Sequence, residues 1–405
     1  MTTTVDTTLL TPLAAYLELR ARGRAAFLLE SVDQGRLGRY SLVGCGDTLV
    51  DLAEAERLDR PVVGYVAYDH VATLEPTVRL PDDGAGLPES RFVAADVLLR
   101  FDHLLGTAEV LAGPSDLELG GRVRVPDAAG ARRGEPTRRF PDAEAYMRGV
   151  EQCKEHIRRG DAFQIVLSQR AERRTDVSPV ALYTALRRVN PSPYLFLLEL
   201  DGIALVGSSP ETLVKREGSR ASVNPIAGST EPGDGDAERL LASPKDRAEH
   251  VMLVDLGRND LSRVCTAGTV RVARFLEAER FSHITHLVSE VVGELRDGVT
   301  SFDLLRATFP AGTVSGAPKV RAMQIVSELE RYRRGPYAGA VLYSLPGGPL
   351  DACIAIRTVV LHEGRALLQA GAGIVAESDP RAEHEECLRK LAALEAAIEL
   401  AEKGV

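Results

Sequence analysis

The stretch that decides the fold is ACIAIRTVVLHEGRALLQAG, residues 352–371. Two apolar runs flank His362-Glu363-Gly364, which is typical of a hairpin turn between two strands. The run GAVLYSL (339–345) precedes them as a further strand, with no helical segment in between. Strands that follow one another without a helix pair antiparallel, so the sequence predicts an α+β fold rather than a doubly wound parallel sheet.

Outward from this stretch, strand-like runs alternate with amphipathic segments. Further strands are expected at AFLLES (26–31), RYSLVG (39–44), PVVGYVAY (61–68), AFQIVLSQRAE (162–172), YLFLLEL (194–200), IALVG (203–207) and GTVRVARF (268–275). Apolar residues at helical spacing predict helices at 11–23, 143–160, 178–189, 245–258, 284–294, 317–331 and 381–402.

A change of composition marks a domain boundary. Between Gly113 and Pro141 the chain is rich in Gly, Pro, Arg and Asp, with only scattered apolar residues. We therefore expect a small α+β N-terminal part at 1–112, a linker at 113–141 and a larger domain at 142–405.

Composition also narrows the functional class. The 405 residues carry a net charge of −9, the opposite sign to that of a typical duplex-binding protein. Aromatic residues make up 5% of the chain and Trp is absent, which leaves few side chains for stacking on single-stranded bases. We expect no nucleic-acid partner.

The sequence offers no signal for secretion or membrane insertion. The N-terminus MTTTVDTTLL lacks a basic start and an apolar core, and no run approaches 18 apolar residues. The five Cys are odd in number and never form Cys-x-x-Cys, so neither a disulfide framework nor a zinc site is indicated. These features predict a cytoplasmic protein with reduced thiols that does not bind a membrane.

Two pairs of acidic residues are spaced for metal chemistry. Asp246 with Glu249, and Glu383 with Glu386, each stand three residues apart in a predicted helix, so both side chains share a face. Mg²⁺ is usually held by one or two carboxylates plus an anionic group of the substrate. The alternative is a solvated helix face, paired with Arg247 or Lys390.

Other residues suggest a site for a small polycarboxylate. Glu211, in the turn-like GSSPET, could be a general acid if an apolar cleft raised its pKa, or could simply be a turn residue. Arg357 lies in an otherwise apolar strand, where it needs either a substrate carboxylate or an internal ion pair. Thr313, in FPAGTVSGAPK, could hold an anion or cap a helix. His286, three residues after His283, could be a ligand, a catalyst or surface.

Long blocks coincide with one family: LLES, NPSPY, SSPE, PIAG, DRAEHVMLVDLGRNDLSRV, FPAGTVSGAPKVRAM, RRGPYAGAV, IAIRT and QAGAGI. The chain resembles the chorismate-utilising enzymes, most nearly anthranilate synthase component I. The resemblance covers nearly all of 142–402 and, more loosely, the first 70 residues. It implies a chorismate-binding fold in which antiparallel sheets form a core flanked by helices, with an active site that binds chorismate through Mg²⁺.

The resemblance also assigns roles. It implies metal ligands at Glu249 and Glu386, with Asp246 and Glu383 beside them. It places the pyruvyl carboxylate at Tyr337 and Arg357, and the ring carboxylate along Gly371 and Gly373. Glu211 corresponds to the acid that protonates the departing C4 hydroxyl, and Thr313, His286 and Lys390 to further catalytic positions.

Two positions discriminate among the reactions of the family. Related isochorismate and salicylate synthases carry Lys, a base that activates water, where this chain has Gln164. Many aminodeoxychorismate synthases carry a nucleophilic Lys where this chain has Ala227. The remaining nucleophile is ammonia, which would give 2-amino-2-deoxyisochorismate and then, by loss of pyruvate assisted by His286, anthranilate.

The resemblance further implies a partner and a regulator. No glutaminase is recognisable, so a glutamine amidotransferase subunit is expected to deliver ammonia. LLES and NPSPY resemble a tryptophan feedback site, formed here by Glu30, Ser31, Asn190, Pro191, Ser192 and Tyr194. Three residues differ from the family pattern and bear on the efficiency of catalysis and on feedback control. Ser229 stands where Thr is usual beside the substrate, Thr230 where Arg is usual, and Asp246 where Glu is usual.

Three functions therefore remain open. The first is an anthranilate synthase subunit acting in tryptophan biosynthesis. The second is a synthase that stops at 2-amino-2-deoxyisochorismate or makes aminodeoxychorismate for a secondary or folate pathway. The third is a non-catalytic sensor of chorismate or tryptophan, which would have no use for the leaving-group acid Glu211.

Overall fold

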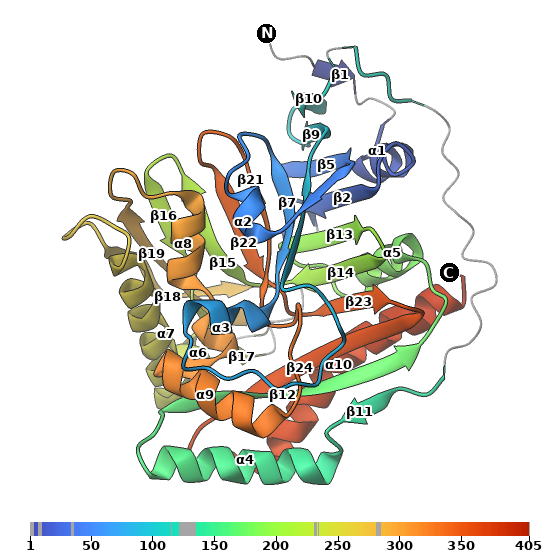
Figure 1. Cartoon of the computed structure of the whole chain (residues 1–405). Coiled ribbons are helices and arrows are strands. Elements are labelled where there is room, and N and C mark those ends of the chain that lie inside the picture. The colour runs from blue at the N-terminus through green and yellow to red at the C-terminus, as the bar shows by residue number, and fades with distance from the viewer. Residues whose placement is uncertain are drawn as a thin grey trace.

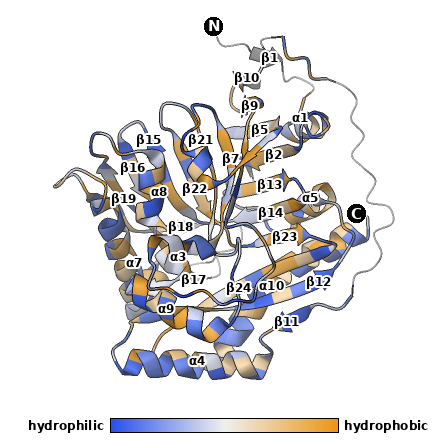
Figure 2. Cartoon of the chain, viewed as in Figure 1, coloured by the Kyte–Doolittle hydropathy of each residue, from blue (hydrophilic) through white to orange (hydrophobic). Residues whose placement is uncertain are grey.

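Two antiparallel sheets and the helices on their outer faces make up the architecture (Figure 1). The computed structural model describes residues 4–6, 10–33, 36–114, 116–120, 135–230, 233, 235–280 and 285–404. Hydrophobic residues follow the strands of both sheets (Figure 2). The prediction of an α+β fold with antiparallel sheets is confirmed.

The larger sheet has twelve strands within the described ranges. Their order is β1 (Thr4–Asp6), β10 (Thr107–Ala112), β9 (Val97–Asp102), β5 (Tyr40–Gly46), β2 (Ala25–Glu30), β13 (Tyr194–Leu200), β14 (Ile203–Ser209), β23 (Thr358–His362), β24 (Arg365–Ile374), β12 (Gln164–Arg174) and β11 (Arg138–Phe140), with β20 (Gly316–Ala317) also paired to β12.

The smaller sheet has ten strands in the same ranges. Their order is β17 (Ile226–Thr230), β19 (Thr285–Glu294), β16 (Arg220–Val223), β15 (Thr212–Glu217), β22 (Leu350–Ile354), β21 (Ala340–Ser344), β7 (Val62–Val66), β8 (Ser90–Ala94) and β6 (Thr48–Val50), with β18 (Arg271–Arg280) also paired to β19. A short hairpin, β3 (Val32–Asp33) and β4 (Arg36–Leu37), stands apart.

Helices complete the layers. They are α1 (Pro12–Leu19), α2 (Leu52–Ala55), α3 (Val71–Leu74), α4 (Ala143–Arg158), α5 (Pro179–Val189), α6 (Asp236–Ala242), α7 (Pro244–Ser262), α8 (Ser301–Thr308), α9 (Lys319–Glu330) and α10 (Pro380–Glu402), with 3₁₀ turns η1 (Tyr68–His70) and η2 (Gly312–Val314). Among the residues described, none of these helices is both long and apolar enough to cross a bilayer.

Apolar side chains from both sheets meet in one cluster, which includes Phe27 of β2, Tyr65 of β7, Phe196 of β13 and Val341 of β21. Strands before and after the predicted linker thus take part in the same two sheets. Burial of this shared apolar surface, worth about 25 cal/mol per Å², holds the sheets together. The sheet junction in turn positions the site.

Two local expectations were wrong. Residues 285–294, predicted as a helix, form strand β19, because β-branched Thr285, Val288, Val291 and Val292 pack as a strand between β16, β17 and β18. The single strand expected through Arg357 breaks there: β22 ends at Ile354 and β23 begins at Thr358. Arg357 itself has a φ of 50°, which interrupts the extended backbone.

Candidate functional site

A cavity of about 540 Å³ lies where the two sheets meet the helices α7 and α10. It brings together twelve residues predicted from the sequence to act on substrate or metal. They are Gln164, Glu211, Ala227, Glu249, His286, Thr313, Tyr337, Arg357, Gly371, Gly373, Glu386 and Lys390. These residues come from strands, helices and turns that are far apart in the chain, so only the tertiary fold assembles them.

Glu211 lies in the tight turn between β14 and β15, where the chain passes from the larger sheet to the smaller one. Burial raises the pKa of its carboxyl from 4.5 to about 7. Thr313, in the turn η2, donates a hydrogen bond to Glu211 Oε1 over 2.8 Å, and this bond lowers the pKa. Lys390 and Arg357 also lower it through their charges. A carboxyl with a pKa near 7 can act as a proton donor at neutral pH.

His286, on β19, has the character of a base. Its Nδ1 lies 2.9 Å from the carbonyl oxygen of Gly228, and because a carbonyl can only accept, Nδ1 carries the hydrogen. Burial lowers the pKa of the imidazole, with Arg357 adding to the effect. The neutral ring therefore holds its lone pair on Nε2, the atom able to accept a proton.

Arg357 supplies a positive charge to the cavity lining, and the neutral Tyr337 hydroxyl lies on the same lining. Burial lowers the pKa of the Arg357 guanidinium and raises that of the Tyr337 hydroxyl. Arg357 lies near Tyr337, Glu386 and Glu211, yet within the described ranges no carboxylate comes within ion-pair distance of its guanidinium. A buried cation facing a cavity suits a carboxylate ligand, the role that the family resemblance implies for Arg357.

Two glycines of β24 leave the cavity open. A Cβ at Gly371 would lie 2.9 Å from both the Tyr337 hydroxyl and the backbone oxygen of Leu167. A Cβ at Gly373 would lie 2.8 Å from Nε2 of Gln164. The absence of side chains at these positions lets a ligand approach the strand, and lets Tyr337 and Gln164 occupy their places.

Glu249, on α7, and Glu386, on α10, supply the carboxylates of the cavity wall. Gln164 Nε2 donates to Glu249 Oε1 over 3.0 Å, and Lys390 Nζ lies 2.6 Å from Glu386 Oε1 and 2.7 Å from the Gly371 oxygen. In the part of the chain that is described, no three His, Cys, Asp or Glu side chains cluster tightly enough to hold a metal alone. Two carboxylates facing a cavity nevertheless fit Mg²⁺, which completes its ligands with water and substrate oxygens.

Some predicted residues lie away from the cavity lining. Asp246 is in the first turn of α7, its backbone N–H bonded to Ser243 Oγ. Glu383, one turn before Glu386 on α10, lies near Tyr146 and Cys387. Ser229 belongs to β17, but its side chain, like His283, falls outside the described residues.

The predicted tryptophan residues divide into two groups. Asn190, Pro191 and Ser192 line the cavity itself. Ser31, Glu30 and Tyr194 do not: Tyr194 donates to Asp351, and Glu30 Oε2 accepts from the Tyr183 hydroxyl. Among the described residues, Oε1 of Glu30 is buried without a hydrogen-bond partner, which marks a place where a ligand donor would be favourable. Val32 donates its N–H to the oxygen of Ser192 and so links the two groups.

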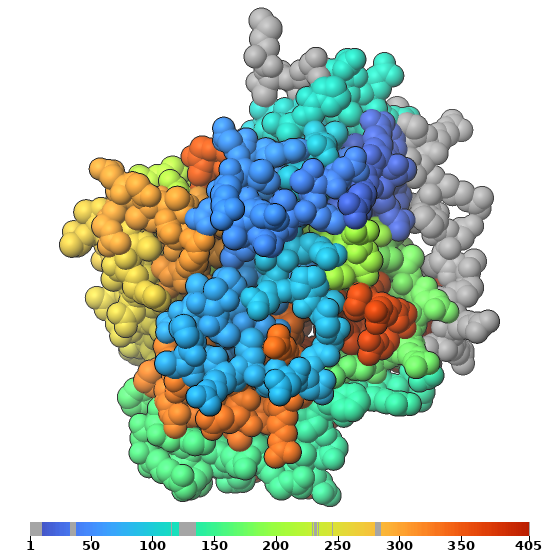
Figure 3. All heavy atoms as spheres, in the orientation of Figure 1, coloured from blue at the N-terminus to red at the C-terminus, as the bar shows by residue number. Residues whose placement is uncertain are grey.

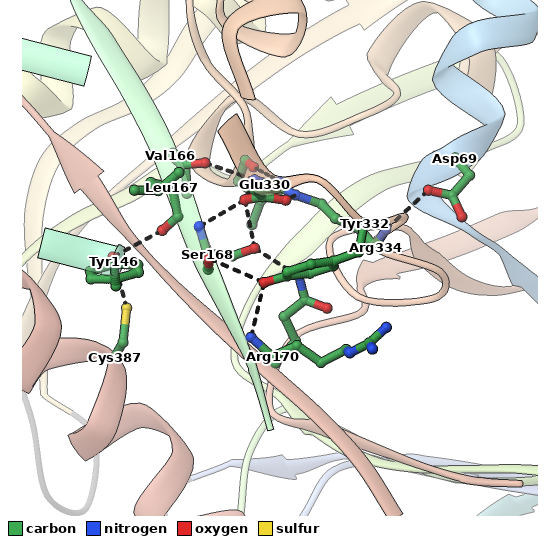
Figure 4. A network of polar contacts seen from close by, with 12 residues as sticks. Asp69, Tyr146, Val166, Leu167, Ser168, Arg170, Glu330, Tyr332, Arg334 and Cys387 are labelled. Carbon is green, nitrogen blue, oxygen red and sulfur yellow. Dashed lines mark hydrogen bonds and ion pairs between the residues drawn. The ribbon is translucent and has the colours of Figure 1, made fainter. Parts of the chain in front are cut away.

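Sequence reasoning missed a buried polar network behind the cavity wall (Figure 4). Its centre is an ion pair of Arg334 with Glu330, whose side chains are only 1% and 2% exposed. The block RRGPYAGAV contains Arg334 but does not reveal its partners. A second cavity, of about 330 Å³, lies behind Tyr337 and opens at the surface between Asp82–Leu87 and Arg333 (Figure 3).

The comparisons with known proteins agree with this geometry. The sequence profile of the chorismate binding enzymes matches residues 20–396, and the chain belongs to this family. The chain is 42% identical to anthranilate synthase component 1 of Thermus thermophilus, over 98% of this chain and 96% of the relative. It is also 42% identical to the Streptomyces coelicolor protein of the same name, over 96% and 87%.

Solved structures extend the comparison. Anthranilate synthase component I from Streptococcus pneumoniae superposes with a TM-score of 0.76 at 32% identity, covering 96% of this chain and 98% of that one. The menaquinone-specific isochorismate synthase of Escherichia coli gives a TM-score of 0.80 at 21% identity, over 98% and 94%. At this low identity, the second likeness shows that the fold is shared.

Proposed function

We propose that this chain is the synthase subunit, component 1, of an anthranilate synthase, converting chorismate and ammonia to anthranilate and pyruvate. The observation that carries the choice of reaction is the hydrogen bond from Gln164 to Glu249. An amide at this position has no basic lone pair with which to activate water. Ammonia needs no such base, and the relatives named anthranilate synthase component 1 support the same choice.

Substrate binding follows from the charges of the cavity. The Arg357 guanidinium and the Tyr337 hydroxyl would hold the pyruvyl carboxylate of chorismate. The ring carboxylate would lie along Gly371 and Gly373, where the backbone is open. Glu249 and Glu386 would hold Mg²⁺, which would neutralise the charge of a bound carboxylate.

Two proton transfers follow from the pKa shifts. Glu211 donates its proton to the C4 hydroxyl, which leaves as water while ammonia forms a bond to C2. The new ammonium group returns a proton to Glu211 or solvent, giving 2-amino-2-deoxyisochorismate. His286 then removes the C2 proton and the C3–O bond breaks, leaving the aromatic ring. The enolpyruvyl group departs as the enolate of pyruvate, whose methylene carbon takes up a proton from His286 or solvent to give pyruvate.

The proposal includes a partner, a regulator and a compartment. A glutamine amidotransferase subunit would supply ammonia, and tryptophan would bind near Glu30 and the segment from Asn190 to Ser192. Because that segment also lines the cavity, a ligand at Glu30 could alter chorismate binding directly. Five buried, unpaired cysteines are consistent with a reducing compartment such as the cytoplasm.

The test is to incubate the isolated chain with chorismate, Mg²⁺ and concentrated ammonium, following anthranilate fluorescence, pyruvate and product mass. Fluorescent anthranilate and pyruvate in equal amounts are expected. An aminated product that keeps its enolpyruvyl group would instead identify a synthase of the second class. Absence of any product would favour the sensor.

A further inference from the structure

The guanidinium of Arg334 binds Glu330 of helix α9 and two segments that line the cavity, β12 and η2 (Figure 4). It forms a two-point ion pair with Glu330, Nε to Oε2 over 2.8 Å and Nη2 to Oε1 over 2.6 Å. Nη1 also donates to the backbone oxygen of Val314, and Nη2 to that of Val166, both over 2.7 Å. Its remaining surface lies over the rings of Tyr68 and Tyr337.

Glu330 is fixed just as firmly from the other side. Its Oε1 accepts from the Ser168 backbone N–H over 2.8 Å and from the Ser168 hydroxyl over 2.7 Å. The Ser168 hydroxyl in turn accepts from Nε2 of Gln369, on the neighbouring strand β24. The Arg334 backbone N–H is itself held by Asp69. The pair is therefore anchored to β12, β24 and η1 together.

The two carbonyl groups that Arg334 holds are next to catalytic side chains. Val314 directly follows Thr313, whose hydroxyl donates to Glu211. Val166 stands two residues after Gln164 on β12, and Tyr337 three residues after Arg334 itself. Within the described residues no backbone hydrogen bond joins η2 to the segment that contains Arg334, so the hydrogen bond from the guanidinium to Val314 connects them.

Stability alone is a poor explanation for this arrangement. A buried ion pair loses much of its Coulomb energy to desolvation and often contributes little net stability compared with apolar residues of similar size. The pair instead fixes the positions of the groups that it contacts, because a planar guanidinium with fixed N–H directions defines where each acceptor lies. Lysine, with one ammonium group, cannot hold Glu330 at two points and both carbonyls as well.

We propose that Arg334, held by Glu330, is a positioning residue that keeps Thr313 on Glu211 and so sets the acid strength of Glu211 in the reaction proposed above. The catalytic consequence of this inference rests on the proposed function, whereas the alignment of Thr313 on Glu211 is a property of the free chain. The groups that face Glu211 are Thr313, Lys390 and Arg357, and of these only Thr313 is adjacent to a contact of Arg334.

The first test measures the pKa of Glu211 directly, by ¹³C NMR of protein labelled at the glutamate carboxyl, with E211Q assigning the resonance. In R334K, loss of the Thr313 hydrogen bond should raise this pKa by about one unit, the usual size of a single hydrogen-bond effect on a carboxyl. The control is R173K, which alters the buried Arg173–Glu402 pair; neither residue lines the cavity. An unchanged pKa in R334K, or an equal rise in R173K, would overturn the proposal.

A second comparison distinguishes an effect through the position of Thr313 from a general loss of rigidity around the cavity. In a T313V background R334K should move the Glu211 pKa no further, because the hydrogen bond is already gone; residues that act through one contact are not additive. Additive shifts would mean that Arg334 acts on Glu211 by another route. In turnover with ammonium, kcat of R334K should fall about tenfold with KM changed by less than about threefold, as for an interaction needed mainly in the transition state.

Two further comparisons distinguish a failure of this proposal from misfolding of the variant and from a failure of the proposed function. If R334K does not fold, S168A replaces it, since it removes one hydrogen bond from Glu330 and should raise the Glu211 pKa in the same direction by less; no rise would refute the proposal. If the wild-type chain makes no product, the proposed function fails, while the NMR comparison still decides whether Arg334 sets the state of Glu211.

Discussion

The Thr313 hydroxyl donates to Oε1 of Glu211 across 2.8 Å, although the two residues are 102 positions apart in the sequence. Burial raises the pKa of Glu211 and the hydrogen bond moderates that rise, because a donor stabilises the charged carboxylate. The resulting value of about 7 makes the carboxyl available both as a proton donor and, after transfer, as an anion. The chemistry of the site depends on this balance.

Replacing Glu211 by Gln should abolish the leaving-group acid and keep the shape of the site. Turnover with ammonium should fall by about 10²–10⁴-fold, the usual contribution of a general acid, while calorimetry should still detect chorismate binding. The matched control is E217Q, which changes an exposed carboxyl at the end of β15 and should leave turnover unchanged. Turnover of E211Q within threefold of wild type would contradict the assigned role.

The same variant should change the pH dependence of stability. Glu211 has a folded pKa of about 7, above the 4.5 of an unfolded glutamate, so the folded state binds the extra proton between these values and loses stability as pH rises through them. E211Q does not titrate. Relative to wild type, it should gain about 3 kcal/mol between pH 4 and pH 8, measured by urea unfolding. A constant difference between the two proteins would show that the pKa is not raised.

The pH profile of kcat should be bell-shaped. Protonated Glu211 is needed, so activity should fall as pH rises above about 7, and neutral His286 is needed, so activity should fall below the usual histidine range. T313V should move the alkaline limb to higher pH, because the bond that lowers the Glu211 pKa is lost. A shift of that limb to lower pH would contradict the account.

Substitution of Ala for Gly371 and for Gly373 should affect the site in different ways. G371A places a Cβ against Tyr337 and the rigid Leu167 carbonyl, so KM for chorismate should rise at least about tenfold, since one displaced polar contact costs about 1–2 kcal/mol. G373A meets only the end of the Gln164 side chain and should instead disturb the Gln164–Glu249 contact. Steady-state kinetics on both variants decide this; equal effects would count against the assigned positions.

The contribution of each carboxylate to Mg²⁺ binding should depend on whether its side chain lines the cavity. E249Q and E386Q should weaken Mg²⁺ binding by at least about tenfold, whereas D246N, whose side chain does not line the cavity, should weaken it less. Titration calorimetry with Mg²⁺ in the presence of chorismate measures this. If D246N were the most damaging, the metal would be held deeper along α7.

Tryptophan binding provides a test of regulation. Glu30 has a buried carboxylate oxygen that no other described residue contacts by a hydrogen bond. E30Q should therefore weaken tryptophan binding by about tenfold or more through loss of a charged acceptor, with kcat in ammonium unchanged. Calorimetry with tryptophan on wild type and E30Q provides the comparison. No binding to the wild-type chain would remove the regulatory site.

Local sequence determined much of the fold. The hairpin of β23 and β24 turns at Glu363-Gly364, the helices α4 and α5 lie within the ranges expected, and α10 begins one residue before its expected range. Apolar periodicity and turn residues act over a few neighbours, so local sequence is enough to predict these elements. Through the family resemblance, the residue types at Gln164 and Ala227 also limit the chemistry, since an amide and a methyl group cannot serve as a base or nucleophile.

Tertiary structure decided the rest. Residues 285–294 became a strand because partners on both sides accept their backbone hydrogen bonds, which no periodicity reveals. Which acids face the cavity, why Glu211 has a raised pKa and how Arg334 reaches Val166 and Val314 all depend on burial by segments far away in the chain. Desolvation and hydrogen bonding are properties of the surroundings of a side chain, and only the folded chain defines those surroundings.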